Sequence, residues 1–365
     1  MIMLKMVFLY KWNIFLIAQW VQWSKCQVSC PEECWCTETF IECQTLMELP
    51  KVFPHSETVQ KIKLQDLNIY NVPGQSFAKM TKLNSLIITV SNIAFIDSCA
   101  FYGVPNLMEL TIEKSAIGSI FEYAFSNMSG IETFTLEKNK IGYIAPFAFS
   151  HLQNIKKMDI KGSGITVLSG QSFYSLYNIS SLRFLDNTIG KYNSGAFQNL
   201  ASVERFEERG NNISNFECGN AYFDSSSVGQ YLFAGNVIKC NCTLMWLMNT
   251  RHGGTFESIL KDNRCWGSMK IQDGTSLANV TLAELGCPEQ NLDHLCTAST
   301  AQSQPKCSSR TQKPLTPREH WQQRPNEDTD KDGKRGIAVA PTASFELLSL
   351  LTTVYIILAF TFIQC

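Results

Sequence analysis

A period of 24 residues constrains this chain more than any other feature of its sequence. Apolar residues open seven consecutive units, each 24 residues after the last: Val59, Leu83, Leu107, Ile131, Ile155, Ile179 and Val203. Each unit continues in the pattern L-x-x-L-x-L, and an isoleucine follows five residues later. Alternate side chains of a strand point to one face, so the pattern predicts a short strand with a buried face. Because one unit cannot bury that face alone, the units are expected to stack.

This pattern is the leucine-rich repeat signature. It predicts the α/β class: a leucine-rich repeat solenoid, or horseshoe, with a parallel sheet on its concave face. Short polar residues at the ninth position are expected to bond the buried backbone of each turn; they are Ser91, Ser115, Asn139, Ser163, Asn187 and Asn211. A row of phenylalanines from Phe77 to Phe197 predicts a second ladder on the convex side. Glu208 replaces an apolar residue of the pattern, which we interpret as a capping irregularity.

Composition points to the secretory pathway. The chain has 365 residues, a net charge of −1 and 14 cysteines. A charge near zero gives no reason to expect nucleic acid as a partner, and clustered cysteines favour an oxidising compartment. Residues 1–26 carry Lys5 and Lys11 before an apolar run and end in Ser24 and Cys26. That arrangement is typical of a signal peptide, with a retained membrane anchor as the alternative.

The chain divides into six segments on these patterns. They are a signal peptide at 1–26, an N-terminal cysteine cap at 27–58, the repeats at 59–227, a last partial repeat with a C-terminal cysteine cap at 228–296, a disordered stalk at 297–344 and an apolar tail at 345–365. The stalk is rich in Ser, Thr, Gln, Pro and charge, a composition that cannot form a packed core.

Two cysteine clusters flank the repeats. The first has the spacing C-x3-C-x-C-x6-C, which fits either a zinc site or two disulfides, and a secreted chain favours disulfides. The clusters resemble the caps of extracellular leucine-rich repeat proteins such as connectin, the Nogo receptor and the lamprey variable lymphocyte receptors. The resemblance implies disulfide-bonded caps, with the pairs Cys30–Cys36, Cys34–Cys43, Cys240–Cys265 and Cys242–Cys287. It also implies a role in protein recognition or cell adhesion.

Four further cysteines lie outside the caps. Cys296 and Cys307 flank the start of the stalk, and we expect them to close a small loop together. Cys99 and Cys218 lie five repeats apart, a distance of ~24 Å in a stacked sheet, whereas a disulfide needs Cα atoms within about 7 Å. They therefore cannot pair with each other. Two interpretations stand for them: buried free thiols, or a bridge to another chain.

Modification signals fit a cell-surface protein. Five N-x-[ST] sequons are candidate glycosylation sites: Asn127, Asn178, Asn212, Asn241 and Asn279. The run from Leu347 to Ile363 has no charge, and no Lys or Arg follows it. A lipid-anchor signal is favoured over a single membrane span, with Gly336 and Ala338 as the candidate attachment residues. Either would place the chain on the extracellular side of the plasma membrane.

The sequence contains no recognisable catalytic or cofactor motif. The histidines are scattered, and the acidic run Asp328 to Gly333 resembles half of a calcium loop but has Val339 where the loop needs a glutamate. We therefore predict no enzyme activity, no cofactor and no metal. The function we predict is a cell-surface receptor for recognition or adhesion. The alternatives are a single-span co-receptor that signals through a membrane partner, and a released matrix or inhibitor protein if the dibasic pair Lys334-Arg335 is cut.

A protein ligand is predicted to bind the concave face, whose strands carry a mixture of charged and uncharged residues. The candidate ligand-binding residues are Ile87, Val90, Glu109, Thr111, Glu113, Lys114, Thr135, Glu137, Lys138, Lys157, Arg183 and Arg205. Ile87 and Val90 form an apolar spot. Glu109, Glu113 and Glu137 lie beside Lys114 and Lys138 and form a mixed patch suited to a charged protein partner. The expected partners are a protein ligand or another cell-surface protein, the membrane through the C-terminal anchor, and, as a further possibility, a second copy of the chain.

Overall fold

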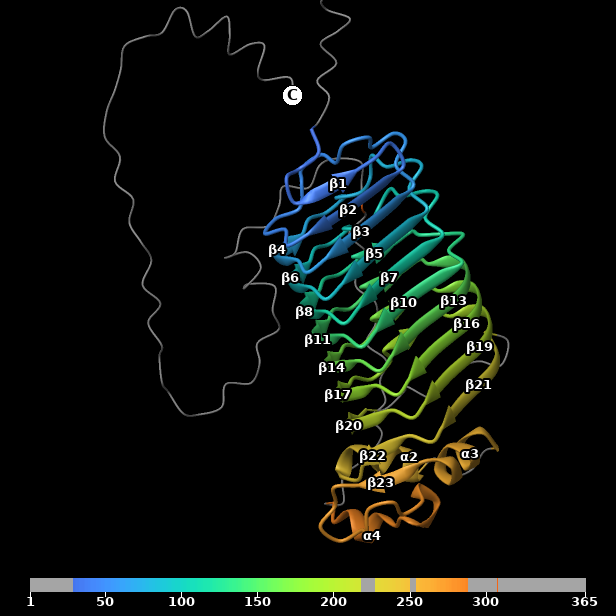
Figure 1. The fold of residues 1–365 in the computed structure, drawn as a ribbon. Helices are drawn as coiled ribbons and strands as arrows, with labels where there is room; N and C mark the ends of the chain where they lie inside the picture. The colour runs from blue at the N-terminus through green and yellow to red at the C-terminus, as the bar shows by residue number, and fades with distance from the viewer. Residues whose placement is uncertain (1–28, 218–226, 250–253, 288–306, 308–365) are drawn as a thin grey trace, which may run out of the picture. The chain divides into compact units, whose positions relative to one another are not determined.

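The repeats build a solenoid with sheets along three sides (Figure 1). The computed structural model describes residues 29–217, 227–249, 254–287 and residue 307. All of these residues except Ser29 belong to one compact unit, Cys30–Gln312. The parallel-sheet solenoid expected from the repeat pattern is confirmed. Within the described ranges, helices occur in the C-terminal cap and not in the repeats.

The ten-stranded sheet forms the concave face. Its strands, in spatial order, are β1 (Cys34–Cys36), β2 (Phe40–Gln44), β3 (Lys61–Gln65), β5 (Ser85–Thr89), β7 (Glu109–Glu113), β10 (Thr133–Glu137), β13 (Gln153–Lys161), β16 (Tyr177–Leu185), β19 (Ala201–Arg209) and β21 (Val228–Ala234). The pair β1–β2 is antiparallel, and every later pair is parallel. Each strand pairs with the equivalent residues of the next repeat, so the 24-residue period sets the register.

Two further sheets close the other sides of the stack. The nine-stranded sheet contains β4 (Asn68–Val72), β6 (Asn92–Ile96), β8 (Ala116–Ile120), β11 (Lys140–Ile144), β14 (Gly164–Leu168), β17 (Thr188–Tyr192), β20 (Asn212–Phe216), β22 (Val237–Lys239) and β23 (Arg264–Trp266). The four-stranded sheet contains β9 (Phe125–Ser126), β12 (Phe149–Ser150), β15 (Phe173–Tyr174) and β18 (Phe197–Gln198). The isoleucine that follows each L-x-x-L-x-L lies in the nine-stranded sheet and points into the core.

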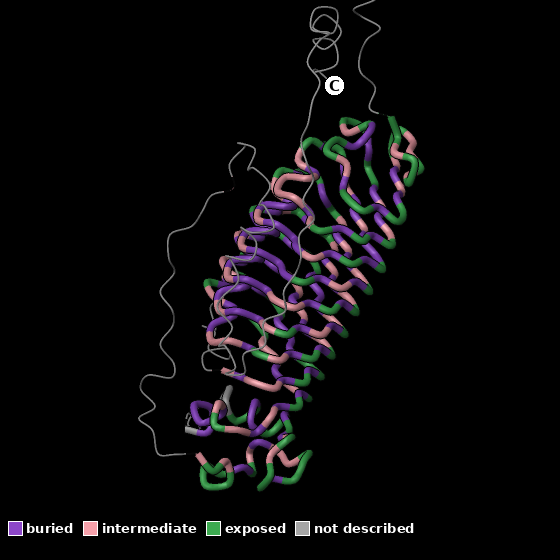
Figure 2. Tube along the Cα trace, turned by 90° about the vertical axis from the view of Figure 1, so that its left-hand side faces the viewer, coloured by how far each residue is buried: buried purple, intermediate pink, exposed green. Residues whose placement is uncertain are grey.

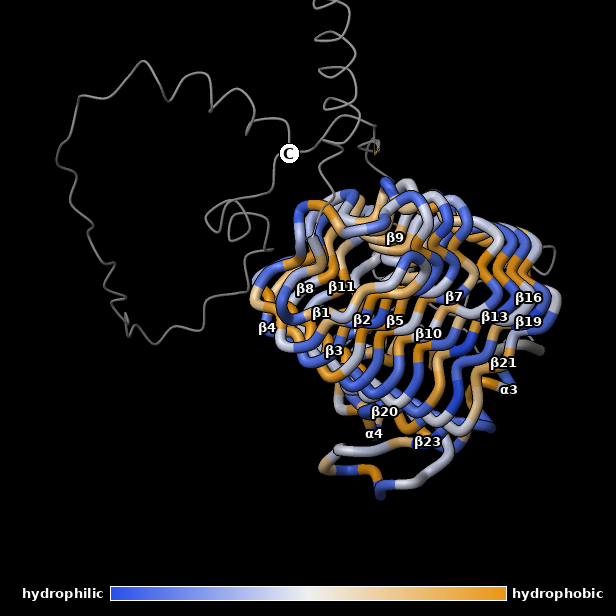
Figure 3. Tube along the Cα trace, turned by 45° about the horizontal axis from the view of Figure 1, so that its top comes forward, coloured by the Kyte–Doolittle hydropathy of each residue, from blue (hydrophilic) through white to orange (hydrophobic). Residues whose placement is uncertain are grey.

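The core is a set of aligned apolar rows between these sheets. Figure 3 shows hydrophobic positions recurring in neighbouring strands, and Figure 2 shows buried residues at matching places in successive repeats. The phenylalanine ladder is stacked as predicted: Phe53, Phe77, Phe101, Phe125, Phe149, Phe173 and Phe197 follow one another with ring centroids 4.5–5.8 Å apart. Such a continuous core explains why no single repeat is stable alone.

A ladder of buried hydrogen bonds runs beside the apolar core. The backbone N–H of Ser115 donates to Asn139 Oδ1 at 2.9 Å, and the N–H of Asn139 donates to Ser163 Oγ at 3.1 Å. The same link continues through Asn187, Asn211, Asn236 and Asn263. Asparagine adds a second bond, because Asn139 Nδ2 donates to Ile112 O at 2.8 Å. The expectation that this position bonds the buried backbone is confirmed.

The caps close both ends of the core. The structure holds Cys30–Cys36 and Cys34–Cys43 at one end, and Cys240–Cys265 and Cys242–Cys287 at the other. The C-terminal cap contains η1 (Cys242–Leu244), α2 (Met245–Asn249), α3 (Gly254–Asp262), η2 (Leu277–Asn279) and α4 (Leu282–Leu285). Trp246 in α2 is buried, and its Nε1 donates to Phe216 O at 3.3 Å. Helix α2 therefore covers the end of the last full repeat.

The expected pair Cys296–Cys307 is wrong. Cys307 forms a disulfide with Cys99, with an S–S distance of 1.92 Å and Cα atoms 5.8 Å apart. A cysteine forms one disulfide, so Cys307 is not available to Cys296. Both interpretations of Cys99, a free thiol and an interchain bridge, are wrong for the same reason. Cys218 is out of reach of Cys99, but Cys307 is not. The 20 residues after Cys287 can reach ~66 Å when extended, well beyond the ~29 Å spanned by six stacked repeats.

Several expectations fall outside the described residues. They concern the signal peptide at 1–26, Cys218 and Cys296, the stalk apart from Cys307, the attachment residues Gly336 and Ala338, and the tail at 345–365. In the part of the chain that the structure describes, no helix has the length and apolar character needed to cross a membrane.

Candidate functional site

The outward residues of the concave sheet form straight rows across the repeats. Residues paired in register across parallel strands point to the same side, so each row is a line of neighbouring side chains. The central row runs Lys63, Ile87, Thr111, Thr135, Asp159, Arg183 and Glu207. A second row runs Lys61, Ser85, Glu109, Thr133, Lys157, Ser181 and Arg205. The candidate residues on strands β5 to β19 thus lie on one face.

Ion pairs occupy the C-terminal half of this face. Asp159 is buried, and Arg183 donates two hydrogen bonds to its carboxylate. Nε donates to Oδ1 at 2.7 Å and Nη2 donates to Oδ2 at 2.5 Å. Lys157 Nζ lies 3.2 Å from the same carboxylate. Burial raises the pKa of Asp159, but hydrogen bonds from Arg183 and Lys157 outweigh it and leave the pKa below its ordinary value. Arg205 pairs with Glu207, two residues further along the same strand, β19. These charges therefore hold the sheet face in place.

The mixed patch in the middle of the face is also paired within the chain. Glu137 contacts Lys161 at 3.0 Å and Lys138 at 3.1 Å, and the hydrogen bond from Lys161 is the main reason that the pKa of Glu137 is lowered. Glu113 contacts Lys114 at 3.5 Å. These pairs are partly exposed, so each contributes little to stability. They remain accessible to a partner.

The N-terminal half of the face offers an uncharged surface. Ile87, Thr111 and Thr135 are adjacent in the central row on β5, β7 and β10. Val90, just past β5, is 50% exposed. Glu109 beside them accepts a hydrogen bond from Ser85 Oγ at 2.6 Å. We call Ile87, Val90, Thr111 and Thr135 the uncharged row. Its side chains are uncharged and face outward.

Val90 has an unusual backbone. Its φ is +51°, in the left-handed region that a β-branched residue rarely adopts. The same position in other repeats is also left-handed, and it holds Asp66, Lys114, Lys138, Gly162, Asp186 and Gly210. The repeat fold therefore imposes the conformation, and Val90 is the β-branched residue among these.

Two aromatic residues of the N-terminal cap, Trp35 and Phe40, belong to the same face and are absent from the predicted site. Trp35 in β1 pairs with Glu42 in β2, which pairs with Lys63 in β3. The Trp35 ring lies 5.6 Å from the ring of Phe40 in an edge-to-face contact. The signal was the Cys34-Trp35-Cys36 triplet, because two inward cysteines in a strand turn the residue between them outward.

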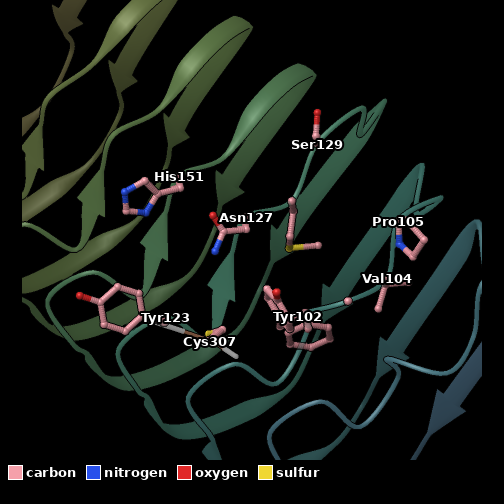
Figure 4. A pocket seen from close by; sticks show the side chains of 11 residues that line it. Tyr102, Val104, Pro105, Tyr123, Asn127, Ser129, His151 and Cys307 are labelled. Atoms are coloured by element: carbon pink, nitrogen blue, oxygen red, sulfur yellow. The ribbon is translucent and has the colours of Figure 1, made fainter. Parts of the chain in front are cut away.

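A cavity of about 840 Å³ lies away from the concave face, beside β9. Figure 4 shows Tyr102, Asn127, His151 and Cys307 around it. Burial lowers the pKa of His151. The sequon residues Asn127, Asn178, Asn212 and Asn279 are exposed, while Asn241 is half-buried and caps η1. Among the described residues, no three His, Cys, Asp or Glu side chains gather as a metal site.

Comparison with known proteins agrees with the repeat architecture. The model of the BspA type leucine rich repeat region matches in six copies, over residues 50–162 and 119–242, which together exceed half of the chain. No curated protein matches the sequence. Among solved structures, human 5T4, a trophoblast glycoprotein also named Wnt-activated inhibitory factor 1, aligns at 18% identity with a TM-score of 0.39, over 71% of this chain and 100% of that one. On the match over its repeats, this chain belongs to the BspA-type leucine-rich repeat family.

Proposed function

We propose that this chain is a recognition protein of the extracellular surface that binds a protein ligand on its concave face. Leucine-rich repeat proteins generally act through protein partners, and the disulfide-bonded caps suit an oxidising compartment. A cell-surface receptor for recognition or adhesion is the specific role that we propose. The division into leader, caps, repeats, stalk and tail given above is part of the proposal.

One observation carries the proposal: the uncharged row lies between charges that are already paired within the chain. A protein partner that covers Ile87, Thr111 and Thr135 would bury apolar and hydroxyl groups without separating an ion pair. The core of a protein interface is depleted in charge, with a polar rim around it. Lys63 with Glu42 on one side, and Lys157 with Asp159 on the other, provide such a rim.

The rigid frame also favours binding over chemistry. Backbone pairing across ten strands and the buried asparagine ladder fix the spacing of the outward side chains. A preorganised surface loses little conformational entropy when a partner binds. The mixed patch of Glu113, Lys114, Glu137 and Lys138 would set the orientation of a charged partner.

The test is a binding screen with matched substitutions. The full chain, presented as a multimer, would be screened against an array of extracellular protein domains. We expect any true ligand to lose tenfold or more in affinity with Thr111→Arg or Thr135→Arg, because the long cation intrudes into the centre of the interface. Thr188→Arg makes the same exchange at an exposed position of the nine-stranded sheet and should leave binding unchanged. A ligand whose affinity falls with Thr188→Arg but not with Thr111→Arg or Thr135→Arg would contradict the proposal.

A further inference from the structure

We propose that the N-terminal cap extends the binding face, and that Trp35 anchors a partner segment carrying an apolar side chain next to a carboxylate. This inference rests on the proposed function, and it adds a subsite and the chemistry of the partner. The observations that carry it are the register of β1, the exposure of Trp35, the packing of the cap core and the charges around Lys61.

The register places Trp35 on the concave face. Strand β1 is antiparallel to β2, and directly opposed residues of such a pair share a side of the sheet. Trp35 is opposite Glu42, Glu42 is opposite Lys63, and Lys63 is opposite Ile87. Trp35 is therefore the first member of the row that continues into Ile87, Thr111 and Thr135. The subsite and the uncharged row are parts of one continuous surface.

Trp35 is too exposed for a residue whose task is to close the cap. It is 62% exposed, and its ring contacts Phe40 edge-on at 5.6 Å. The cap core beneath it is complete without it, since Ile41 and Cys43 are fully buried. Tryptophan at a protein interface contributes a large apolar area at low entropic cost, and it is enriched among the residues that dominate binding. Trp35 is thus available to a partner.

The charges near Trp35 are of both signs, with Glu42 directly opposite it, and Lys61 is the nearby cation that has no ion pair among the described residues. Phe40, which packs on Trp35, is opposite Lys61 in β3. On the adjoining strands Lys63 is paired with Glu42 at 2.8 Å. Lys61 is exposed, and within the described residues no ion pair involves it. Glu109 lies two strands away from Lys61 in the same row and accepts its hydrogen bond from Ser85. A carboxylate of the partner would therefore form an ion pair with Lys61, beside the aromatic rings of Phe40 and Trp35.

The experiment pans a phage-displayed library of random peptides on the purified full chain. We expect enrichment of peptides that combine a leucine or an aromatic residue with Asp or Glu. Synthetic copies of the enriched peptides should bind the Trp35→Ala variant roughly tenfold more weakly. Lys61→Glu should weaken them to a similar extent, whereas Lys61→Arg, which keeps the charge, should retain binding.

Controls separate loss of binding from loss of fold and from failure of the wider proposal. Met47→Ala removes another exposed apolar side chain of the cap, outside the concave strands, and should change nothing. Equal thermal midpoints for Trp35→Ala and the parent chain would show that the cap is intact. Peptides that lose affinity with Thr111→Arg but not with Trp35→Ala would overturn this inference and leave the proposed function standing. The inference would also be overturned if the enriched peptides were basic, or if their binding changed with neither Trp35→Ala nor Thr111→Arg. A library that yields no enriched peptide would overturn it as well.

Discussion

At the scale of single residues, Glu208 is a carboxylate placed in an apolar row. It is buried, and the hydroxyls of Tyr192 and Tyr231 donate to its two oxygens at 2.6 and 2.7 Å. Burial raises the pKa of Glu208 to about 7, and the two hydrogen bonds oppose that rise. Burial also raises the pKa of both tyrosines, so both remain donors across the neutral range. The irregularity that the sequence suggested is a buried hydrogen-bonded triad.

The triad predicts a pH dependence of stability. Between about pH 4.5 and pH 7 the folded chain keeps a proton on Glu208 that the unfolded chain has released, so the free energy of unfolding falls as pH rises through this window. The full loss is about 3 kcal/mol. Glu208→Gln cannot titrate, and denaturation measured at pH 4.5 and 8 should show a smaller decrease for the variant than for the parent. Glu204→Gln changes an exposed residue of the same strand and should show the same decrease in the free energy of unfolding as the parent. Parallel curves for Glu208→Gln and the parent would contradict the assignment.

Val90 gives a second prediction at this scale. A left-handed backbone costs a non-glycine residue about 1–2 kcal/mol, whereas asparagine tolerates it better. Val90→Asn should therefore raise the free energy of unfolding by about 1 kcal/mol, and should weaken ligand binding because the exposed apolar side chain is gone. Val237→Asn applies the same exchange to an exposed valine in β22 with an ordinary backbone, and should give no gain in stability. Higher stability with undiminished binding would show that Val90 has no part in the interface.

At the scale of elements, the ninth position of each repeat connects neighbouring turns, and its two side-chain types differ in what they satisfy. Asn187 Oδ1 accepts from Ser163 N at 2.9 Å, and its Nδ2 donates to Ile160 O at 2.9 Å. Asn187→Ala would leave both buried groups unpaired, at about 1–3 kcal/mol each. Asn187→Ser should cost less, because the serines of this ladder also accept the N–H of the preceding repeat. Chemical denaturation of both variants tests the ladder, and equal losses would contradict it.

The sequence predicted the repeated strands and ladders well, because the residues that form them recur at a fixed period. The inward residues of β3 to β19, the phenylalanine stack and the polar ladder all repeat every 24 residues, so one rule predicts each of them. Strand β1 lies outside this repeat pattern. The Cys-x-Cys spacing indicates that Trp35 lies on the face opposite the two cysteines, but the antiparallel pairing of β1 with β2 decides which row of the sheet it joins, and spacing does not contain that pairing. Ion pairing of the candidate residues, such as Arg183 with Asp159, likewise depends on neighbours in other repeats.

At the scale of the whole molecule, the disulfide Cys99–Cys307 joins the second repeat to a segment beyond the C-terminal cap. Its two cysteines are 208 residues apart in the sequence. Cys99 is buried next to Tyr123 and Phe147, with Tyr102 and Tyr174 packed around them, and Ser126 Oγ lies 3.3 Å from Cys307 Sγ. The composition around Cys307 does not predict this bond, because it indicates a polar stalk that is independent of the repeats. A cysteine in a polar linker carries no sign of a partner so far away in the chain.

Removing this bond should destabilise the solenoid through its unfolded state. A cross-link that closes a long loop restricts the unfolded chain, and its loss typically costs 2–4 kcal/mol. We expect Cys307→Ser and the double variant with Cys99→Ser to lose similar stability in chemical denaturation, since both remove one bond. Cys296→Ser is the discriminating control, because it should preserve a Cys99–Cys307 peptide in disulfide mapping by mass spectrometry. If Cys296→Ser instead lost as much stability as Cys307→Ser, and no Cys99–Cys307 peptide were found in the parent chain, a Cys296–Cys307 bond would replace the one described here. With the bond in place, Cys307 is fixed to the second repeat, in the same half of the solenoid as the uncharged row.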